Sequence, residues 1–155
     1  MRWLKDRHDP VFADWKTFIK TELLRDALAK RPLGSFGPAI EKLRKWCQWN
    51  DAVKQTLIDR HNEGHQIVII SGALDIYLPE LLKELPSHTL ICTTMAQKNG
   101  VLTGELAGDN CVRAAKAFML KNYLAEHEEL GESWGYGNAP DDLPMLNLLT
   151  HRIII

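Results

Sequence analysis

Residues 65–72, His65-Gln66-Ile67-Val68-Ile69-Ile70-Ser71-Gly72, are the stretch of this sequence that decides the fold. The four consecutive residues Ile67–Ile70 are all β-branched and do not alternate with polar ones. Such a run is typical of a strand buried on both faces, as the strands of a parallel sheet are. The stretch therefore predicts one buried strand, with Ser71 and Gly72 directly after its carboxyl end.

The sequence on both sides of this strand indicates helices and further strands. Upstream, three helices are predicted: one over 15–29, with Trp15, Phe18, Ile19, Leu23, Ala27 and Leu28 on its apolar face; one around 40–47, with Trp46 on its apolar face; and one from the N-cap Asn50 to Gly64. Downstream, the predicted elements are a helix over 75–85, a strand at 90–92, a hairpin turning at Asn99-Gly100, a helix over 112–126, a strand at 134–136, a helix over 142–149 and a strand at 152–155. This order predicts an α/β fold in which helices flank a Rossmann-like parallel sheet.

The composition excludes several classes of protein. The chain has 155 residues, 45% hydrophobic and 25% charged, which is typical of a soluble globular protein with one core. Its 19 Lys and Arg and 20 Asp and Glu residues give a net charge of −1, which argues against a nucleic-acid partner. No apolar run reaches the roughly 18 residues that cross a membrane. The three cysteines, Cys47, Cys92 and Cys111, are odd in number and widely spaced, so we expect reduced thiols and a cytoplasmic protein.

Polar residues that could carry chemistry follow two of the predicted strands. Ser71 and Gly72 follow the first, and Asn138, Asp141 and Asp142 follow the strand at 134–136. Ligands of α/β sheets bind outside the carboxyl ends of the strands. Lys116, on the helix over 112–126, has small alanine neighbours that allow close approach. A hydroxyl, a free amide, a cation and carboxylates together could hold a phosphate beside Mg²⁺.

Three segments of the chain resemble motifs of one known family. They are GHQIVIISGA, NCVRAAKAFML and WGYGNAPDDLPML, in this order, and KNGVLTGEL between them resembles a hairpin of the same family. The chain from Asn50 to Ile155 thereby resembles the haloacid dehalogenase superfamily, in its phosphoserine-phosphatase-like branch. The resemblance implies a helical cap-like region over 1–49 and an α/β core over 50–155.

The resemblance also implies roles for these six residues. Ser71 would donate a hydrogen bond to the transferring phosphoryl group, together with the amide of Gly72, and Lys116 would neutralise the phosphate. Asn138 stands where the family usually has an aspartate ligand of Mg²⁺, and Asp142 matches the second acidic position of that motif. Asp141 lies between them, at a position that often carries a polar group near the phosphate. From the residues alone, Ser71 and Asp142 could equally be helix caps.

The family's nucleophile motif, DxDx[TV] on the central first strand, has no clear match in the chain. The nearest phrase is Asp14-Trp15-Lys16-Thr17-Phe18, which has lysine at the acid/base position and fits a helical period better. Asp6 and Asp9 have no apolar strand before them. We therefore expect that the nucleophile, the general acid/base and the central strand are missing, and that the chain is an internally started, truncated or degenerate member.

Two functions of different classes follow from these expectations. The first is a phosphohydrolase domain that, in its complete form, hydrolyses phosphomonoesters through an aspartyl-phosphate, with little or no turnover by this chain alone. The alternative is a non-catalytic phosphate-binding or interaction domain. A nucleotide-binding Rossmann domain is disfavoured because neither GxGxxG nor GxxxxGK[ST] occurs. The expected ligand is a small phosphorylated molecule, with Mg²⁺ bound weakly or not at all, and without a nucleic-acid or membrane partner.

The missing strand has a predicted consequence for the fold. In the resembled family, the central strand lies between the strands that correspond here to residues 67–70 and 134–136. Without it, both strands lose a hydrogen-bonded neighbour, and buried orphan groups cost on the order of 1–3 kcal/mol each. We expect direct pairing of the two strands, a homodimer that covers the exposed sheet edge, or a marginally stable monomer.

Overall fold

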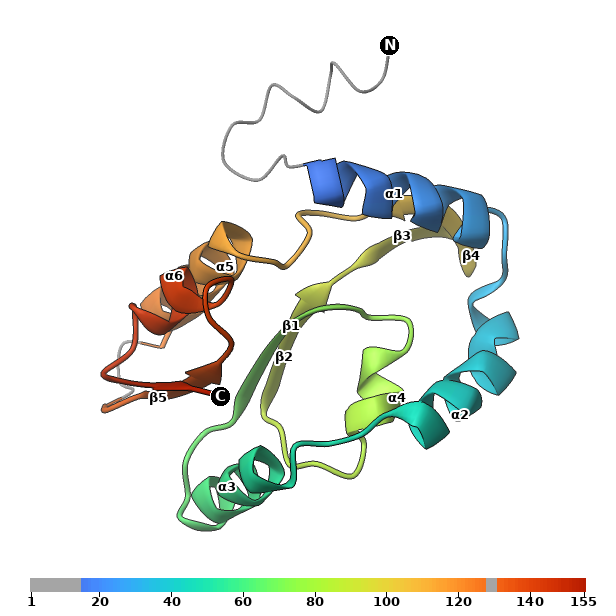
Figure 1. Cartoon of the computed structure of the whole chain (residues 1–155). Coiled ribbons are helices and arrows are strands. Elements are labelled where there is room, and N and C mark those ends of the chain that lie inside the picture. The colour runs from blue at the N-terminus through green and yellow to red at the C-terminus, as the bar shows by residue number, and fades with distance from the viewer. Residues whose placement is uncertain (1–14, 128–130) are drawn as a thin grey trace.

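The computed structural model describes residues 15–127 and 131–155 (Figure 1). Its elements, in chain order, are α1 (Trp15–Leu28), the 3₁₀ helix η3 (Leu33–Phe36), α2 (Gly37–Trp46), α3 (Asp51–Asn62), β1 (Val68–Leu74), α4 (Leu78–Leu82), β2 (Thr89–Thr93), β3 (Met95–Lys98), β4 (Val101–Leu106), α5 (Ala114–Ala125), β5 (Trp134–Gly137), α6 (Leu143–Leu146) and β6 (His151–Ile154). The alternation of helices and parallel strands confirms the predicted α/β fold class. None of the described helices is long and apolar enough to cross a membrane.

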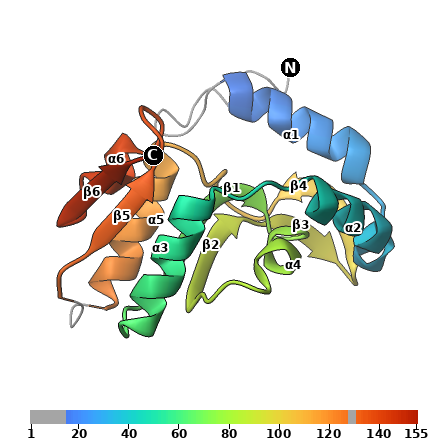
Figure 2. The same ribbon diagram turned by 60° about the horizontal axis from the view of Figure 1, so that its bottom comes forward.

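The described strands form three two-stranded sheets rather than one continuous sheet. β1 pairs with β2 in parallel, from Val68 opposite Thr89 to Ser71 opposite Cys92. β5 pairs with β6 in parallel, and β3 with β4 as an antiparallel hairpin. Figure 2 shows the β1–β2 pair, in green and yellow, apart from the β5–β6 pair, in orange and red. Within the described ranges β1 and β5 do not pair with each other, so the predicted direct pairing of these strands is wrong.

β1 and β5 nevertheless point in the same direction, on either side of a cavity that both of them line. Before β1, the ring of His65 lies 5.1 Å from the ring of Trp134, the first residue of β5. Beyond the carboxyl end of β5, Asp142 contacts Lys116 on α5, and the chain just before α5 packs against Gly72 of β1. The two amino ends and the two carboxyl ends therefore lie at the same sides of the molecule.

Two apolar clusters hold the elements together. The first joins α5 and α6 to the β1–β2 pair around Leu120, Tyr123 and Leu146. The second joins α1 to the β3–β4 hairpin, where Leu24 and Leu28 pack against Met95 and Leu102. An ion pair between Arg25 and Glu105, 2.7 Å long, fixes α1 to β4 at the same place.

Several local predictions are confirmed. The side chain of Asn50 caps α3 by accepting a hydrogen bond from the amide of Val53. Gly64 follows α3 with a φ of 88°, a left-handed conformation that glycine adopts without steric cost. Asn99 and Gly100 have φ angles of 51° and 75°, and positive values at both positions are what a type I′ hairpin turn requires.

The predicted apolar faces of the first two helices are partly wrong. Trp15 and Leu23 of α1 are 65% and 63% exposed, and Ile19 also faces solvent. Trp46, at the last position of α2, is 78% exposed. For α1, the cause is that the helix rests on the narrow β3–β4 hairpin, which covers the side with Leu24 and Leu28 and leaves the neighbouring side open.

The chain between β1 and β2 also differs from its prediction. β1 continues through Ser71 and Gly72 to Leu74, so these two residues lie within the second half of the strand rather than after it. The predicted helix over 75–85 shortens to α4, Leu78–Leu82, because both the amide and the carboxylate of Asp75 are bonded to the chain at Thr93 and Met95. Ser71 does not cap that helix, since its hydroxyl oxygen accepts from the amide of Ala73.

Candidate functional site

The six predicted site residues come from three parts of the chain that meet at the carboxyl ends of β1 and β5. Ser71 and Gly72 belong to β1, Lys116 to the first turn of α5, and residues 138–142 to the turn after β5. The segment Asn110–Arg113, which precedes α5, lies between these groups and touches them all. The structure therefore brings the six residues to one edge of the fold, and their roles there remain a prediction.

Lys116 and Asp142 form a largely buried ion pair at this edge. The Nζ of Lys116 lies 2.6 Å from Oδ1 of Asp142, and the two side chains are 15% and 12% exposed. The other carboxylate oxygen of Asp142 accepts a hydrogen bond of 3.1 Å from the amide of Asn138. Asp142 stands at the N-cap position of α6 but makes no capping bond there, because its carboxylate is turned toward Lys116 instead.

Gly137 makes this position of Asp142 possible. A Cβ atom on Gly137 would lie 2.8 Å from Oδ2 and 2.9 Å from Cβ of Asp142, closer than real Cβ contacts. The glycine at the end of β5 is therefore required by the carboxylate that folds back over it.

Asp141 and Asn138 are more open to solvent than Asp142. The carboxylate of Asp141 is 62% exposed and lies 3.1 Å from Nε of Arg113. Asn138 is exposed as well, at the start of the turn. Each carboxylate of this turn thus has a cationic partner from the start of α5.

Ser71 and Gly72 pack closely against the segment before α5. A Cβ on Gly72 would lie 2.7 Å from the side chain of Val112 and 3.2 Å from the carbonyl oxygen of Cys111, so only glycine fits at this strand position. The hydroxyl oxygen of Ser71 accepts from Ala73, which leaves the hydroxyl proton for a ligand.

Cys111 lies fully buried between Ser71 and Lys116. Burial raises the pKa of its thiol to about 11; a smaller rise comes from Cys92, while Lys116, the backbone of Ser71 and Lys20 act in the opposite direction. All three cysteines are free thiols; Cys111 is buried, whereas Cys47 and Cys92 are half-buried. At this pKa, Cys111 stays a neutral thiol near pH 7.

Lys20 is a residue of this region that the sequence did not single out. Its ammonium, on α1, donates to the carbonyl oxygen of Gly72 at 2.9 Å and to Oδ1 of Asn110 at 2.6 Å. Burial lowers its pKa, and Cys111 partly offsets this effect. The hydroxyl of Thr93, at the end of β2, reaches the same carbonyl at 3.2 Å and accepts from the amide of Cys111. Lys20 and Thr93 thus fix the backbone at the carboxyl end of β1.

Part of this network carried a sequence signal. Thr93 follows the apolar run at 90–92, so the rule that ligands bind at the carboxyl ends of strands applies to Thr93 as it does to Ser71. Asn110 is the first residue of the motif NCVRAAKAFML, which also contains Lys116. Lys20 carried none, because it lies on a different helix, 52 residues away from its partner Gly72.

Among the described residues, the donor set at this edge does not fit a resident Mg²⁺ ion. In the part of the chain that the structure describes, no group of three or more histidine, cysteine, aspartate or glutamate side chains could hold a metal. Both oxygens of Asp142 are engaged, by Lys116 and by the amide of Asn138. Asp141 is paired with Arg113. Mg²⁺ needs carboxylate oxygens that are free to coordinate it, so it would have to displace a cation that is already bound there.

A separate apolar cavity lies between the two strands. A cavity of about 590 Å³ separates β1 from β5, and its walls are formed by apolar side chains of both strands and of α3 and α5. None of the six predicted site residues lines it. The polar edge and the apolar cavity are therefore two different features of the molecule.

Comparison with known proteins places the fold and these motifs in a family. A model of haloacid dehalogenase-like hydrolases matches residues 15–147, which is most of the chain. The chain belongs to the haloacid dehalogenase-like hydrolase family. The resemblance seen in the three motifs is thereby confirmed.

Among curated family relatives are two phosphoserine phosphatases. The enzyme of Streptococcus thermophilus is 25% identical over 108 residues, which are 69% of this chain and 50% of the relative. That of Methanocaldococcus jannaschii is 23% identical over 107 residues, which are 68% of this chain and 51% of the relative. The chain thus spans about half the length of the curated relatives it matches.

Solved structures share the fold at lower identity. A protein of unknown function from Bordetella pertussis matches 99% of this chain and 70% of its own length, with a TM-score of 0.78 and 15% identity. A substrate-bound phosphoserine phosphatase matches 99% of this chain and 71% of its own length, with a TM-score of 0.66 and 18% identity. These likenesses support the hydrolase-type α/β fold.

Proposed function

We propose that this chain is the phosphate-binding part of a haloacid dehalogenase-type phosphohydrolase. Ser71, the amide of Gly72 and Lys116 would hold the phosphate group of a small phosphorylated molecule at the carboxyl ends of the strands. In the complete enzyme, the reaction would be hydrolysis of a phosphomonoester through an aspartyl-phosphate. The names of the curated relatives make O-phosphoserine the first substrate to test.

The pair of Lys116 and Asp142 is the observation that carries this proposal. The largely buried ammonium of Lys116 can bind an anion, and the carboxylate of Asp142 is the group that an incoming anion would have to displace. A phosphate that displaces the carboxylate would gain Lys116 as a charge-assisted donor, together with the hydroxyl of Ser71. The buried surroundings strengthen these interactions relative to bulk water.

We propose further that the chain alone has little or no hydrolytic turnover. The two carboxylates described at this edge are both paired with cations, and neither is placed as a free nucleophile. The phrase that begins at Asp14, like Asp6 and Asp9, starts outside the described residues; its part from Trp15 onward lies in α1, as the helical period predicts. Mg²⁺ would bind weakly here, because it competes with Lys116 and Arg113.

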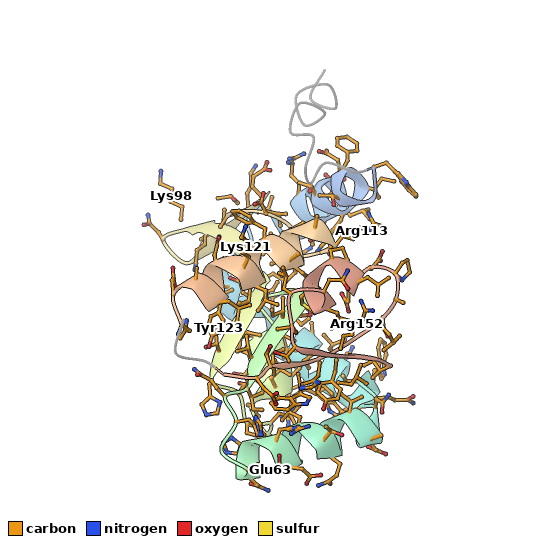
Figure 3. All side chains as sticks on the ribbon, turned by 90° about the vertical axis from the view of Figure 1, so that its left-hand side faces the viewer. Glu63, Lys98, Arg113, Lys121, Tyr123 and Arg152 are labelled. Carbon is orange, nitrogen blue, oxygen red and sulfur yellow. The ribbon has the colours of Figure 1, made fainter. Side chains whose placement is uncertain are left out.

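An NMR titration tests phosphate binding. Inorganic phosphate and O-phosphoserine are added separately to the chain, and the amide signals of residues 71–73 and 114–117 are followed. Millimolar phosphate should shift these signals, and the shifts should be lost in Lys116→Met and reduced in Ser71→Ala. Lys121→Met is the matched control, since Lys121 is an exposed lysine on the same helix (Figure 3). The absence of shifts near Ser71 and Lys116 would refute the site.

An assay with p-nitrophenyl phosphate and Mg²⁺ tests turnover. We expect no hydrolysis above the buffer rate, because nucleophile and base act as a unit and the remaining residues cannot replace them. Hydrolysis that disappears in a Ser71→Ala, Lys116→Ala double variant would show that a nucleophile is present after all.

A further inference from the structure

We propose that the end of α2, together with a small cleft beside it, is a docking surface for an acidic segment of another protein. This interaction goes beyond the proposed phosphate site and does not depend on it. The surface consists of the exposed residues Lys42, Lys45 and Trp46 of α2, and of Trp49 and Lys54, which line the cleft. These five residues are called the basic aromatic surface below.

α2 presents two lysines and a tryptophan to solvent. Lys45 and Trp46 follow Lys42 by three and four residues, so the three side chains share one face of the helix, and all three are exposed. Ile40 and Leu43, on the other face, are half-buried. Figure 1 shows α2 at the outside of the molecule, next to α4 and far from α5 and β5. The exposed face of α2 is therefore open to a partner.

The two tryptophans of the basic aromatic surface are unusual for a solvent-exposed region. Trp46 is more exposed than any other large apolar side chain among the described residues, and Trp49 is exposed as well. Tryptophan has a large apolar surface that is unfavourable to leave in water. It is also enriched among the few residues that carry most of the binding energy of protein interfaces. Two such residues in one short segment indicate a contact with another protein.

A polar cleft lies beside the tryptophans. Its volume is about 230 Å³, and its walls come from the end of α2, the connection to α3, the first turn of α3, and α4 with the residues after it. Arg44 ties α2 to the chain after α4, since its guanidinium lies 2.7 Å from the carboxylate of Glu84. The side chain of Asn50 caps the start of α3. The cleft is thus formed before a partner binds, and none of the six predicted site residues lines it.

The unpaired charges at this surface are mainly positive. Within the described residues, the three lysines of the basic aromatic surface make no ion pair. Two neighbouring acidic residues, Glu41 and Glu84, lie 3.6 and 2.7 Å from the guanidinium of Arg44 and are neutralised by it. Asp51, at the start of α3, is the acidic residue that remains. Three unpaired ammonium groups beside one unpaired carboxylate attract an acidic partner.

An anionic membrane matches this surface less well than a protein does. A helix that lies in a membrane surface inserts a continuous apolar face between the lipids. On α2, Ile40 and Leu43 are turned toward the protein, so Trp46 is the apolar side chain of this helix that is left to insert.

A nucleic acid also matches it less well. Its phosphates would approach the carboxylates of Glu41 and Glu84, which flank Arg44. Proteins that bind nucleic acids usually carry a basic excess, whereas the net charge of this chain is −1.

An acidic peptide meets every feature of the surface. One carboxylate of the peptide would enter the cleft and pair with Lys54, and others would pair with Lys42 and Lys45 along α2. An apolar side chain between these carboxylates would cover Trp46 and Trp49. The tryptophans would then supply most of the affinity, and the lysines would select for charge.

The experiment uses the full chain and a fluorescein-labelled peptide, Glu-Asp-Leu-Glu-Phe-Asp-Glu-amide. One control peptide has glutamine and asparagine in place of the acidic residues, and a second has serine in place of leucine and phenylalanine. Fluorescence polarisation measures binding. We expect saturable binding of the first peptide with a Kd below roughly 1 mM, and binding of each control that is weaker by about tenfold or more.

Cys47 provides a second readout, because its half-buried thiol lines the cleft. At a peptide concentration of about twice the Kd, alkylation of Cys47 by iodoacetamide should slow by about threefold, since two thirds of the clefts are then occupied. The rate at Cys92, which is half-buried and outside the cleft, should stay unchanged. Mass spectrometry follows both thiols.

Matched pairs of exposed residues test the location. Trp46→Ala should weaken binding by about tenfold or more, and Lys45→Glu by about threefold or more. Trp15→Ala, on α1, and Lys98→Glu, in β3 (Figure 3), should leave binding unchanged. All four side chains are exposed, so the variants are expected to fold.

Several outcomes would overturn the proposal. They are equal binding of the acidic peptide and its neutral control, no binding of the acidic peptide, and equal effects of Trp46→Ala and Trp15→Ala. Tighter binding to phosphatidylserine vesicles or to a single-stranded oligonucleotide, lost in Trp46→Ala, would assign the surface to a membrane or to a nucleic acid instead. A concentration-dependent dimer that Trp46→Ala abolishes would assign it to a second copy of the chain.

Discussion

The ammonium of Lys116 lies 2.6 Å from the carboxylate of Asp142, and this ion pair joins the start of α5 to the turn after β5. Both side chains are mostly buried, so each charge depends on the other for its stabilisation. In a site that receives a phosphate, the same carboxylate competes with the ligand for the lysine. The pair therefore links the stability of this edge to its affinity for anions.

Asp142→Asn should raise the affinity for inorganic phosphate by about threefold to tenfold, because the substitution frees Lys116 without changing the shape of the turn. Calorimetric titration of both proteins measures the change. Asp141→Asn is the control and should have a smaller effect, since its ion pair with Arg113 is exposed. A weaker affinity in Asp142→Asn would mean that the carboxylate itself helps to hold the ligand, and would contradict the competition.

Gly137→Ala should lower the free energy of unfolding by about 1–3 kcal/mol. The added Cβ would lie under 3 Å from the side chain of Asp142, so the ion pair or the strand end has to move. Gly108→Ala is the matched control, because nothing lies within 4 Å of a Cβ at that glycine. Urea denaturation of both variants measures the difference, and equal stabilities would show that the turn after β5 adapts freely.

The thiol of Cys111 should make the protein less stable at alkaline pH. Burial raises its pKa from an ordinary value of 9.0 to about 11, so the folded chain keeps a proton that the unfolded chain loses. The resulting stabilisation is complete below pH 9 and disappears as the pH rises through about 11, with a loss on the order of 2 kcal/mol.

Denaturant unfolding of the parent chain and Cys111→Ala between pH 8 and pH 11 isolates this effect, since the difference between the two curves should shrink across the interval. Lys20 acts in the opposite sense, because burial lowers its pKa and its contribution rises with pH, but it is common to both proteins. Parallel curves would contradict the buried neutral thiol.

The positions of the strands and of the hairpin could be predicted because their signals are local. The β-branched run at 67–70 and the Asn99-Gly100 pair depend on a few adjacent residues, and the structure has β1 and a type I′ turn there. The rule that ligands bind at the carboxyl ends of strands singled out Ser71 and the turn at 138–142, and the structure has both of them, together with Lys116, at one edge of the fold.

The packed side of α1 and the partners of the site residues could not be predicted, because they depend on residues that are distant in the sequence. Leu23 looked like a core residue, but the side of α1 that packs is chosen by the narrow hairpin beneath it. Asp142 looked like a helix cap or a metal ligand, and its actual partner is a lysine 26 residues earlier in the chain. Lys20 was not predicted as a site residue, because its partners Gly72 and Asn110 are 52 and 90 residues away in the sequence.

Tyr123→Phe should leave the free energy of unfolding unchanged or raise it by up to about 1 kcal/mol. The hydroxyl of Tyr123 is buried without a partner, so its removal takes away a desolvation cost and no hydrogen bond. Tyr136→Phe, at a half-buried ring that lines the same cavity between β1 and β5 as Tyr123, is the control and should stay within about 0.5 kcal/mol of the parent. Chemical denaturation at pH 7 measures both variants. A loss of 1 kcal/mol or more in Tyr123→Phe would show that the hydroxyl has a hydrogen-bond partner in solution.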